Sequence, residues 1–75
     1  MSQKIIGILG IGGYLGRFTA KKLLDTGHQI IGAQRSNVDF FSEYPNFQYE
    51  MVDVIYEDQL IKFIEKCDIV VNCVS

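Results

Sequence analysis

The order of hydrophobic and polar positions predicts strands that alternate with helices along the whole chain. Short and largely apolar runs are typical of strands that are covered on both faces of a sheet. The predicted strands are residues 4–9, 29–33, 47–52 and 68–74. Apolar side chains at helical spacing predict helices over residues 14–26 and 57–66, the second with Leu60, Ile61, Phe63 and Ile64 facing inward. Gly27 follows the first helix, at a position that favours a positive φ.

A third, short helix is predicted between the second and third strands. Ser36 or Asn37 can cap its N-terminus, and its aromatic residues are Phe40, Phe41 and Tyr44. Pro45 closes this helix, because the residue before a proline is pushed out of the helical region.

This alternation predicts an α/β fold with a doubly wound parallel sheet of the Rossmann type. Parallel neighbours need crossover connections, and right-handed crossovers give the four strands the order 3-2-1-4. The 75 residues suffice for a single small domain. Residues 68–74 are apolar enough for a central strand, so we expect residues 1–75 to form the N-terminal portion of a larger domain of this fold, without a second domain in this chain.

Composition and charge exclude several classes of partner. The net charge of −2 gives no electrostatic footprint for nucleic acid or an anionic membrane. The N-terminal sequence MSQKIIGILG lacks the apolar stretch of a signal peptide, and no run is long enough for a membrane span. Cys67 and Cys73 lie at opposite ends of the last predicted strand, too far apart for a disulfide. We expect them to be reduced and buried in a cytoplasmic protein.

A cluster of glycines in ILGIGGYLG, residues 8–16, predicts a phosphate-binding loop. A strand that ends in glycines and leads into a helix collects free N–H groups and the positive end of the helix dipole, which suit a pyrophosphate. Gly10 would make the tight turn, Gly12 or Gly13 would admit the ligand, and Gly16 would let the helix press against the first strand. Tyr14 and Leu15 complete the predicted loop. The alternative is a structural turn without a ligand.

The end of the second strand indicates which dinucleotide is bound. NAD sites usually place an acidic residue here, and none occurs between residues 30 and 38. Arg35, followed by Ser36, can instead contact a 2′-phosphate, so the sequence favours NADP over NAD. The alternative is a solvated arginine beside a helix-capping serine.

Four further residues are predicted to line the cofactor cleft. Asp53 and Val54 follow the third strand, where such domains often place a group near the adenine ring, although Asp53 could equally serve a turn. Cys73 and Val74 end the fourth strand beside the first. The sequence offers no metal-ligand spacing and no catalytic acid–base pair.

Three segments together resemble a known family. These are GIGGYLGRFTAKKLL, IIGAQRS and MVDVIYEDQLIKFIEKCDIVVNCVS, which resemble the N-terminal region of saccharopine-dehydrogenase-like oxidoreductases. The chain is also similar to the extended short-chain dehydrogenase/NmrA-like group, which shares G-x-x-G-x-x-G and the arginine. Either resemblance implies a phosphate loop at the four glycines, a 2′-phosphate contact at Arg35 and an adenine-side acid at Asp53.

We therefore expect the cofactor-binding part of an NADP(H)-dependent oxidoreductase resembling saccharopine dehydrogenase. Its small-molecule substrate would be bound by a downstream region, which would also supply the catalytic residues. A homo-oligomer of the protein is compatible with this expectation. Two alternatives stay open, namely a non-catalytic NmrA-like module that senses NAD(P) and an extended short-chain dehydrogenase or sugar-nucleotide epimerase.

Overall fold

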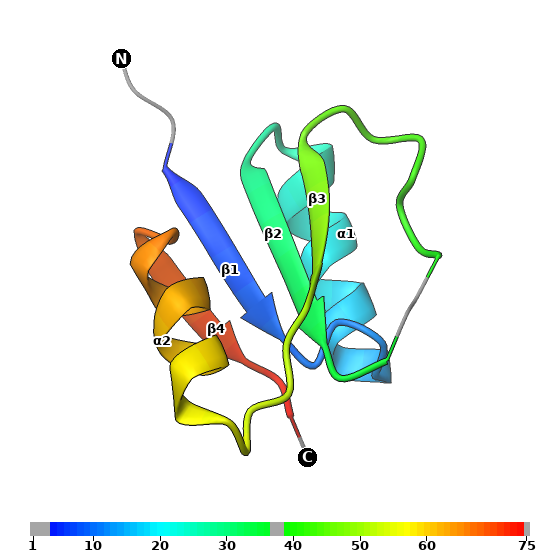
Figure 1. The fold of residues 1–75 in the computed structure, drawn as a ribbon. Helices are drawn as coiled ribbons and strands as arrows, with labels where there is room; N and C mark the ends of the chain where they lie inside the picture. The colour runs from blue at the N-terminus through cyan, green and yellow to red at the C-terminus, as the bar shows by residue number, and fades with distance from the viewer. Residues whose placement is uncertain (1–3, 37–38, 75) are drawn as a thin grey trace.

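The computed structural model describes residues 4–36 and 39–74, which form a four-stranded parallel sheet flanked by two helices (Figure 1). The elements are β1 (Ile5–Leu9), α1 (Tyr14–Asp25), β2 (Gln29–Gln34), β3 (Phe47–Met51), α2 (Glu57–Glu65) and β4 (Ile69–Asn72). The strand order is β3-β2-β1-β4, and all three neighbouring pairs are parallel. The predicted order 3-2-1-4 is therefore confirmed, with element ends that differ from the predicted ones by one or two residues at most.

The core has one layer on each face of the sheet, because β1 and β2 are apolar on both faces. On one face, Ile6, Ile8 and Ile30 pack with Ala20 and Leu24 of α1. On the other face, Phe63 of α2 packs in a cluster with Leu9, Ile31, Ala33 and Val52. The two helices thus cover opposite faces, α2 in front of the sheet and α1 behind it in Figure 1. This arrangement makes the sheet doubly wound.

The described residues of the connection between β2 and β3, 35–36 and 39–46, form no helix, so the prediction of a short helix there is wrong. Phe41 has a φ of 65°, outside the helical region, and its ring packs edge-on against Tyr44 and Phe47, with centroids 5.8 and 5.4 Å away. The packing of these aromatic rings therefore determines the backbone conformation of this segment. Asn37, one of the two proposed caps, lies outside the described residues.

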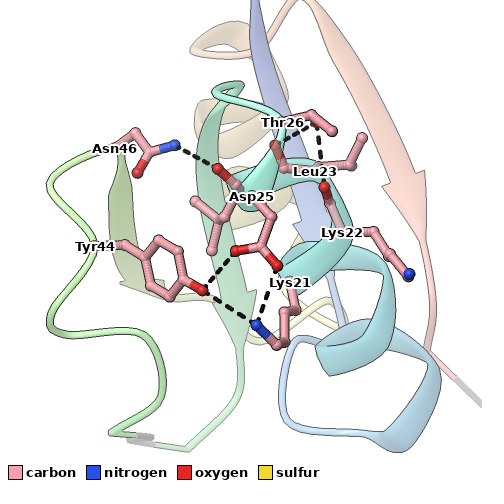
Figure 2. Close-up of polar contacts among 8 residues, drawn as sticks. Lys21, Lys22, Leu23, Asp25, Thr26, Tyr44 and Asn46 are labelled. Carbon is pink, nitrogen blue, oxygen red and sulfur yellow. Dashed lines mark hydrogen bonds and ion pairs between the residues drawn. The ribbon is translucent and has the colours of Figure 1, made fainter.

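Side-chain hydrogen bonds also link this connection to the C-terminal end of α1 (Figure 2). The hydroxyl of Tyr44 donates to Asp25 over 2.7 Å, and Lys21 contacts both of them. The amide of Asn46 donates to the carbonyls of Leu24 and His28. These are contacts between segments far apart in the sequence, which local periodicity does not reveal.

The inward face of α2 is narrower than predicted. Phe63 is fully buried and Leu60 half-buried, whereas Ile61 and Ile64 are each 44% exposed. The helix therefore contacts the sheet along a single line of side chains. No helix among the described residues is long and apolar enough to cross a membrane.

Both cysteines are free thiols, as expected, but they are half-buried rather than buried. Cys67 lies just before β4, and its Sγ donates to the carbonyl of Phe63 over 3.3 Å. Burial, together with the nearby Glu50 and Asp68, raises the pKa of this thiol.

Candidate functional site

The turn that leaves β1 depends on Gly10. Its φ is +79°, and a Cβ placed on it would lie 2.9 Å from the carbonyl group of Cys73 and from the backbone nitrogen of Val74. The N–H groups of Gly10 and Ile11 both donate to the carbonyl of Ala33, at the end of β2. The turn is thus fixed where β1, β2 and β4 end side by side.

Gly16 allows α1 to approach this turn closely. It is buried, and a Cβ on it would collide with the carbonyl oxygen of Gly10 and lie 3.0 Å from Cα of Ile11. Backbone atoms cannot move aside as a flexible side chain can. Gly16 therefore has the geometry predicted for it, close packing of the helix against the end of the first strand.

Gly12 and Gly13 have N–H groups that are already bonded within the protein. Gly12 donates to Oε1 of Gln34 over 2.6 Å, and Gly13 donates to the carbonyl of Gly10 over 3.1 Å. A Cβ on Gly13 would meet only the Gly10 oxygen, at 3.6 Å, so Gly13 faces open space. These two N–H groups therefore already have acceptors within the protein.

The donors that remain are at the start of α1. Gly13 is the N-cap residue, and no side chain caps the helix. In an α-helix the first N–H groups have no acceptor within the helix. In α1 these are the N–H groups of Tyr14, Leu15 and Gly16. The positive end of the helix dipole adds to their attraction for an anion.

A cavity of about 360 Å³ adjoins this loop, at the carboxyl ends of the strands. Seven of the predicted site residues line it: Gly10, Gly13, Arg35, Asp53, Val54, Cys73 and Val74. Sequence reasoning missed its other lining residues, which are Leu9, Ala33, Gln34, Val52 and Ile55. Gln34 carried a signal that could have found it, because it is a polar residue at the end of a buried strand.

Five predicted site residues do not line this cavity: Gly12, Tyr14, Leu15, Gly16 and Ser36. The side chain of Tyr14 is 80% exposed and borders a second hollow, between α1 and the 39–43 segment. That hollow also contains Arg17, whose guanidinium lies over the ring of Phe40, 4.9 Å from its centroid. Tyr14 and Leu15 can therefore contribute to the main cavity only through their backbone.

The segment that carries Arg35 is held by Tyr49 of β3. The Tyr49 hydroxyl donates to the backbone carbonyl of Ser36 and lies 3.3 Å from that of Gln34. Burial raises the pKa of this hydroxyl, so it stays a protonated donor over the physiological range. Arg35 itself is exposed at the rim of the cavity.

Asp53 has the turn role that its sequence position allowed, and it also lines the cavity. Its Oδ1 accepts the N–H of Ile55 over 3.2 Å, and its own N–H donates to the side chain of Gln59 over 2.9 Å. It thereby shapes the turn into α2 while it lines the cavity. The Arg35 guanidinium and the Asp53 carboxylate thus both line the cavity, next to the uncapped N-terminus of α1.

The described residues contain no group of three or more His, Cys, Asp or Glu side chains that could hold a metal ion. The polar side chains that line this cavity include one guanidinium, one carboxylate and the carboxamide of Gln34, and the backbone donors of α1 lie next to it. Such a set suits a ligand that carries both phosphate and polar ring atoms.

Solved structures share this fold over nearly the whole chain. Uronate dehydrogenase from Agrobacterium tumefaciens superposes with a TM-score of 0.82 at 23% identity, covering 100% of this chain and 28% of that one. WbmH from Bordetella bronchiseptica, in complex with NAD+, has a TM-score of 0.80 at 22% identity, covering 99% and 27%. AtPrR2 with NADP+ and (+)pinoresinol has a TM-score of 0.81 at 19% identity, covering 100% and 27%. The chain therefore spans about a quarter of the length of these structures.

A model of the NAD dependent epimerase/dehydratase family matches residues 6–75. The resemblance to saccharopine-dehydrogenase-like oxidoreductases is not supported by these comparisons, whereas the second resemblance, to the extended short-chain dehydrogenase group, is. The matched range includes the glycine loop and the carboxyl ends of all four strands. Because the match takes in nearly the whole chain, the chain belongs to the NAD dependent epimerase/dehydratase family.

Proposed function

We propose that this chain is the part of an oxidoreductase or epimerase that binds a nicotinamide dinucleotide, with NADP preferred. The observation that carries the proposal is the uncapped N-terminus of α1, which meets a cavity at the carboxyl ends of β1, β2 and β4. In doubly wound sheets, ligands bind outside the carboxyl ends of the strands where the strand order reverses. Here the order reverses between β1 and β4, because β2 and β3 lie on one side of β1 and β4 lies on the other.

The residues present fit such a cofactor. The N–H groups of Tyr14 and Leu15 would hold the pyrophosphate, and Gly13 leaves space beside them because no Cβ stands there. Asp53, Val54 and Ile55 would lie along the adenine half. The backbone of Cys73 and Val74 would flank the centre of the dinucleotide. When bound, the nicotinamide ring supplies the hydride chemistry.

The preference for NADP rests on Arg35. A guanidinium can pair with a 2′-phosphate through two parallel N–H donors, and the chain offers no acid in the segment from residue 30 to 38 that would repel it. Of the neighbouring structures named above, WbmH is in complex with NAD+ and AtPrR2 is described with NADP+. Fold likeness alone does not distinguish the two cofactors, and the Arg35 side chain favours NADP+.

We further propose that substrate binding and catalysis belong to regions that this chain does not include. The solved relatives are about four times as long as the chain. Among the described cavity residues, none forms an acid–base pair suited to proton transfer at a substrate. The domain's own contribution is therefore to bind and orient the dinucleotide.

Substitution of Gly13 tests the proposal, because it separates binding from folding. A side chain at Gly13 meets no close contact and its backbone is extended, so Gly13→Val should fold. It should nevertheless fill the approach to the first turn of α1 and abolish NADP+ binding in a calorimetric titration of the full-length protein. Gln48→Val, at an exposed position of β3, is the control and should leave the affinity unchanged. Equal affinities of Gly13→Val and wild type would refute a pyrophosphate site at this loop.

A further inference from the structure

The second hollow, between α1 and the 39–43 segment, lies outside the candidate dinucleotide site. Its volume is about 580 Å³. One wall, the α1 wall, is formed by Tyr14, Arg17, Phe18 and Lys21, whose helical spacing places them on one face of the helix. None of these four side chains lines the cavity beside the glycine loop. The proposed function therefore leaves this face of α1 unused.

Aromatic side chains are exposed at this hollow. Tyr14 is 80% exposed and Phe18 is 54% exposed. On the opposite wall, the 39–43 wall, Phe40 and Phe41 are half-buried. Exposed aromatic rings beside an arginine are typical of surfaces that become buried when proteins associate. The hollow therefore has the composition of an interaction surface.

The two walls of the hollow carry opposite charges. The α1 wall has the cations Arg17 and Lys21, and the 39–43 wall has the carboxylates of Asp39 and Glu43. Within the described residues, these two carboxylates form no ion pair and no side-chain hydrogen bond. A partner of one charge sign would be repelled by one of the walls. A fitting partner must therefore carry both signs in the reverse arrangement.

Arg17 and Asp39 lie at about the same height along α1. The guanidinium of Arg17 lies over the ring of Phe40, 4.9 Å from its centroid, and Asp39 directly precedes Phe40. Arg17 stacks on this ring, and in the described part of the chain it forms no ion pair. Both charges are therefore available to a partner.

Lys21 faces the same wall one helical turn further along α1. Its Nζ lies 3.4 Å from the hydroxyl of Tyr44, which directly follows Glu43 (Figure 2). An ammonium group has three N–H donors, and two of them are directed at Tyr44 and Asp25. The third is left for an acceptor on a partner. Lys21 and Glu43 thus form a second pair of opposite charges at a common height.

A second copy of this chain supplies the arrangement that the hollow requires. In a face-to-face pair, a two-fold axis that runs along the hollow, parallel to α1, keeps the height of each residue and exchanges the two walls. The α1 wall of each copy then lies opposite the 39–43 wall of the other, and every contact occurs twice. An axis across the hollow would instead place cation against cation.

We propose that the second hollow is an interface between two copies of this chain. In it, Arg17 of each copy faces Asp39 of the other, and Lys21 faces Glu43. The exposed ring of Phe18 is covered in the same contact. This inference goes beyond the proposed dinucleotide function and does not depend on it.

A mixture of two charge-reversal variants tests this interface. In Arg17→Glu alone, and in Asp39→Arg alone, both symmetry-related contacts become like-charged. We expect the dissociation constant of the pair, measured by sedimentation equilibrium on the full-length protein, to rise by at least about tenfold in each variant. In an equimolar mixture, the two reversed charges face each other and the other contact keeps its native signs. The mixture should therefore associate with a constant within about threefold of that of the wild type.

Control variants separate this contact from general effects of charge and folding. Lys62→Glu and Glu65→Arg, at exposed positions of α2, should leave the association unchanged, alone and mixed. Phe18→Ser should weaken association without a change of charge, and helical circular dichroism checks that each variant is folded. A wild-type protein that stays monomeric at about 0.1 mM would overturn the proposal. So would association that no variant at the hollow changes, or a mixture that associates no better than either folded variant alone.

Discussion

The carbonyl oxygen of Gly10 occupies the space in which a Cβ of Gly16 would lie. This contact presses the first turn of α1 against the turn that ends β1, and both partners are backbone atoms. The positions of the uncapped N–H groups of α1 relative to the strand ends therefore depend on the absence of a side chain at Gly16.

Gly16→Ala should destabilise the protein. An alanine inside a helix ordinarily gains about 0.5–1 kcal/mol over glycine, but overpacking against a rigid neighbour costs about 1–3 kcal/mol, and here the neighbour is backbone. We expect a net loss in the free energy of unfolding of about 1–2 kcal/mol, measured by urea denaturation. Lys22→Ala, on the exposed face of α1, should change it by less than about 0.5 kcal/mol. A Gly16→Ala variant as stable as wild type would mean that α1 can withdraw from the turn.

Arg35→Ala should weaken the binding of NADPH and spare that of NADH. Loss of a charge-assisted contact costs roughly 1.5–3 kcal/mol, or about ten- to a hundredfold in affinity. Fluorescence titration with each reduced cofactor measures the two effects separately. Arg17→Ala is a matched control, because Arg17 lies over Phe40 outside the cavity. Equal losses for the two cofactors would show that Arg35 does not contact the 2′-phosphate.

The pKa of the Asp25 carboxyl should indicate whether the 39–46 connection is bound to α1 through Tyr44. The Tyr44 hydroxyl, and after it Lys21, lower the pKa of the Asp25 carboxyl (Figure 2). A carboxyl whose pKa is lower in the folded state stabilises the fold above its unfolded pKa, and this contribution is lost as the pH falls through the folded value.

Tyr44→Phe should therefore raise the pKa of Asp25, although Lys21 keeps it below the ordinary value. A ¹³C titration of the carboxyl group by NMR measures the shift, and the same titration of Asp58, in the first turn of α2, is an internal control. An Asp25 pKa that is identical in the two proteins would contradict the observed hydrogen bond.

The parallel sheet and the glycine loop could be predicted from the sequence because each follows from local information. Apolar runs such as residues 4–9 leave little choice but a buried strand, and right-handed crossovers then limit the strand order. The glycines likewise mark the turn into α1 directly. Even so, their number did not reveal that Gly12 and Gly13 already donate to Gln34 and Gly10.

What could not be predicted depends on contacts between distant segments. The connection before β3 has helical spacing, yet Phe41 adopts a positive φ so that its ring packs with Phe47, and Tyr44 bonds to α1 instead. The contact between Gln34 and Gly12 spans 22 residues. No periodicity in either segment encodes it, because it exists only once β1 and β2 are paired.

The most direct test of the central claim is an amide NMR titration of the ¹⁵N-labelled full-length protein with NADP+. If the dinucleotide binds at this loop, the amide signals of Tyr14 and Leu15, at the uncapped end of α1, and of Arg35, at the end of β2, should show saturable shifts. The chemical shifts of the Lys22 and Asp25 amides, at the opposite end of the same helix, should not change. Saturable shifts confined to other parts of the chain, or none at saturating NADP+, would contradict a dinucleotide site at this loop.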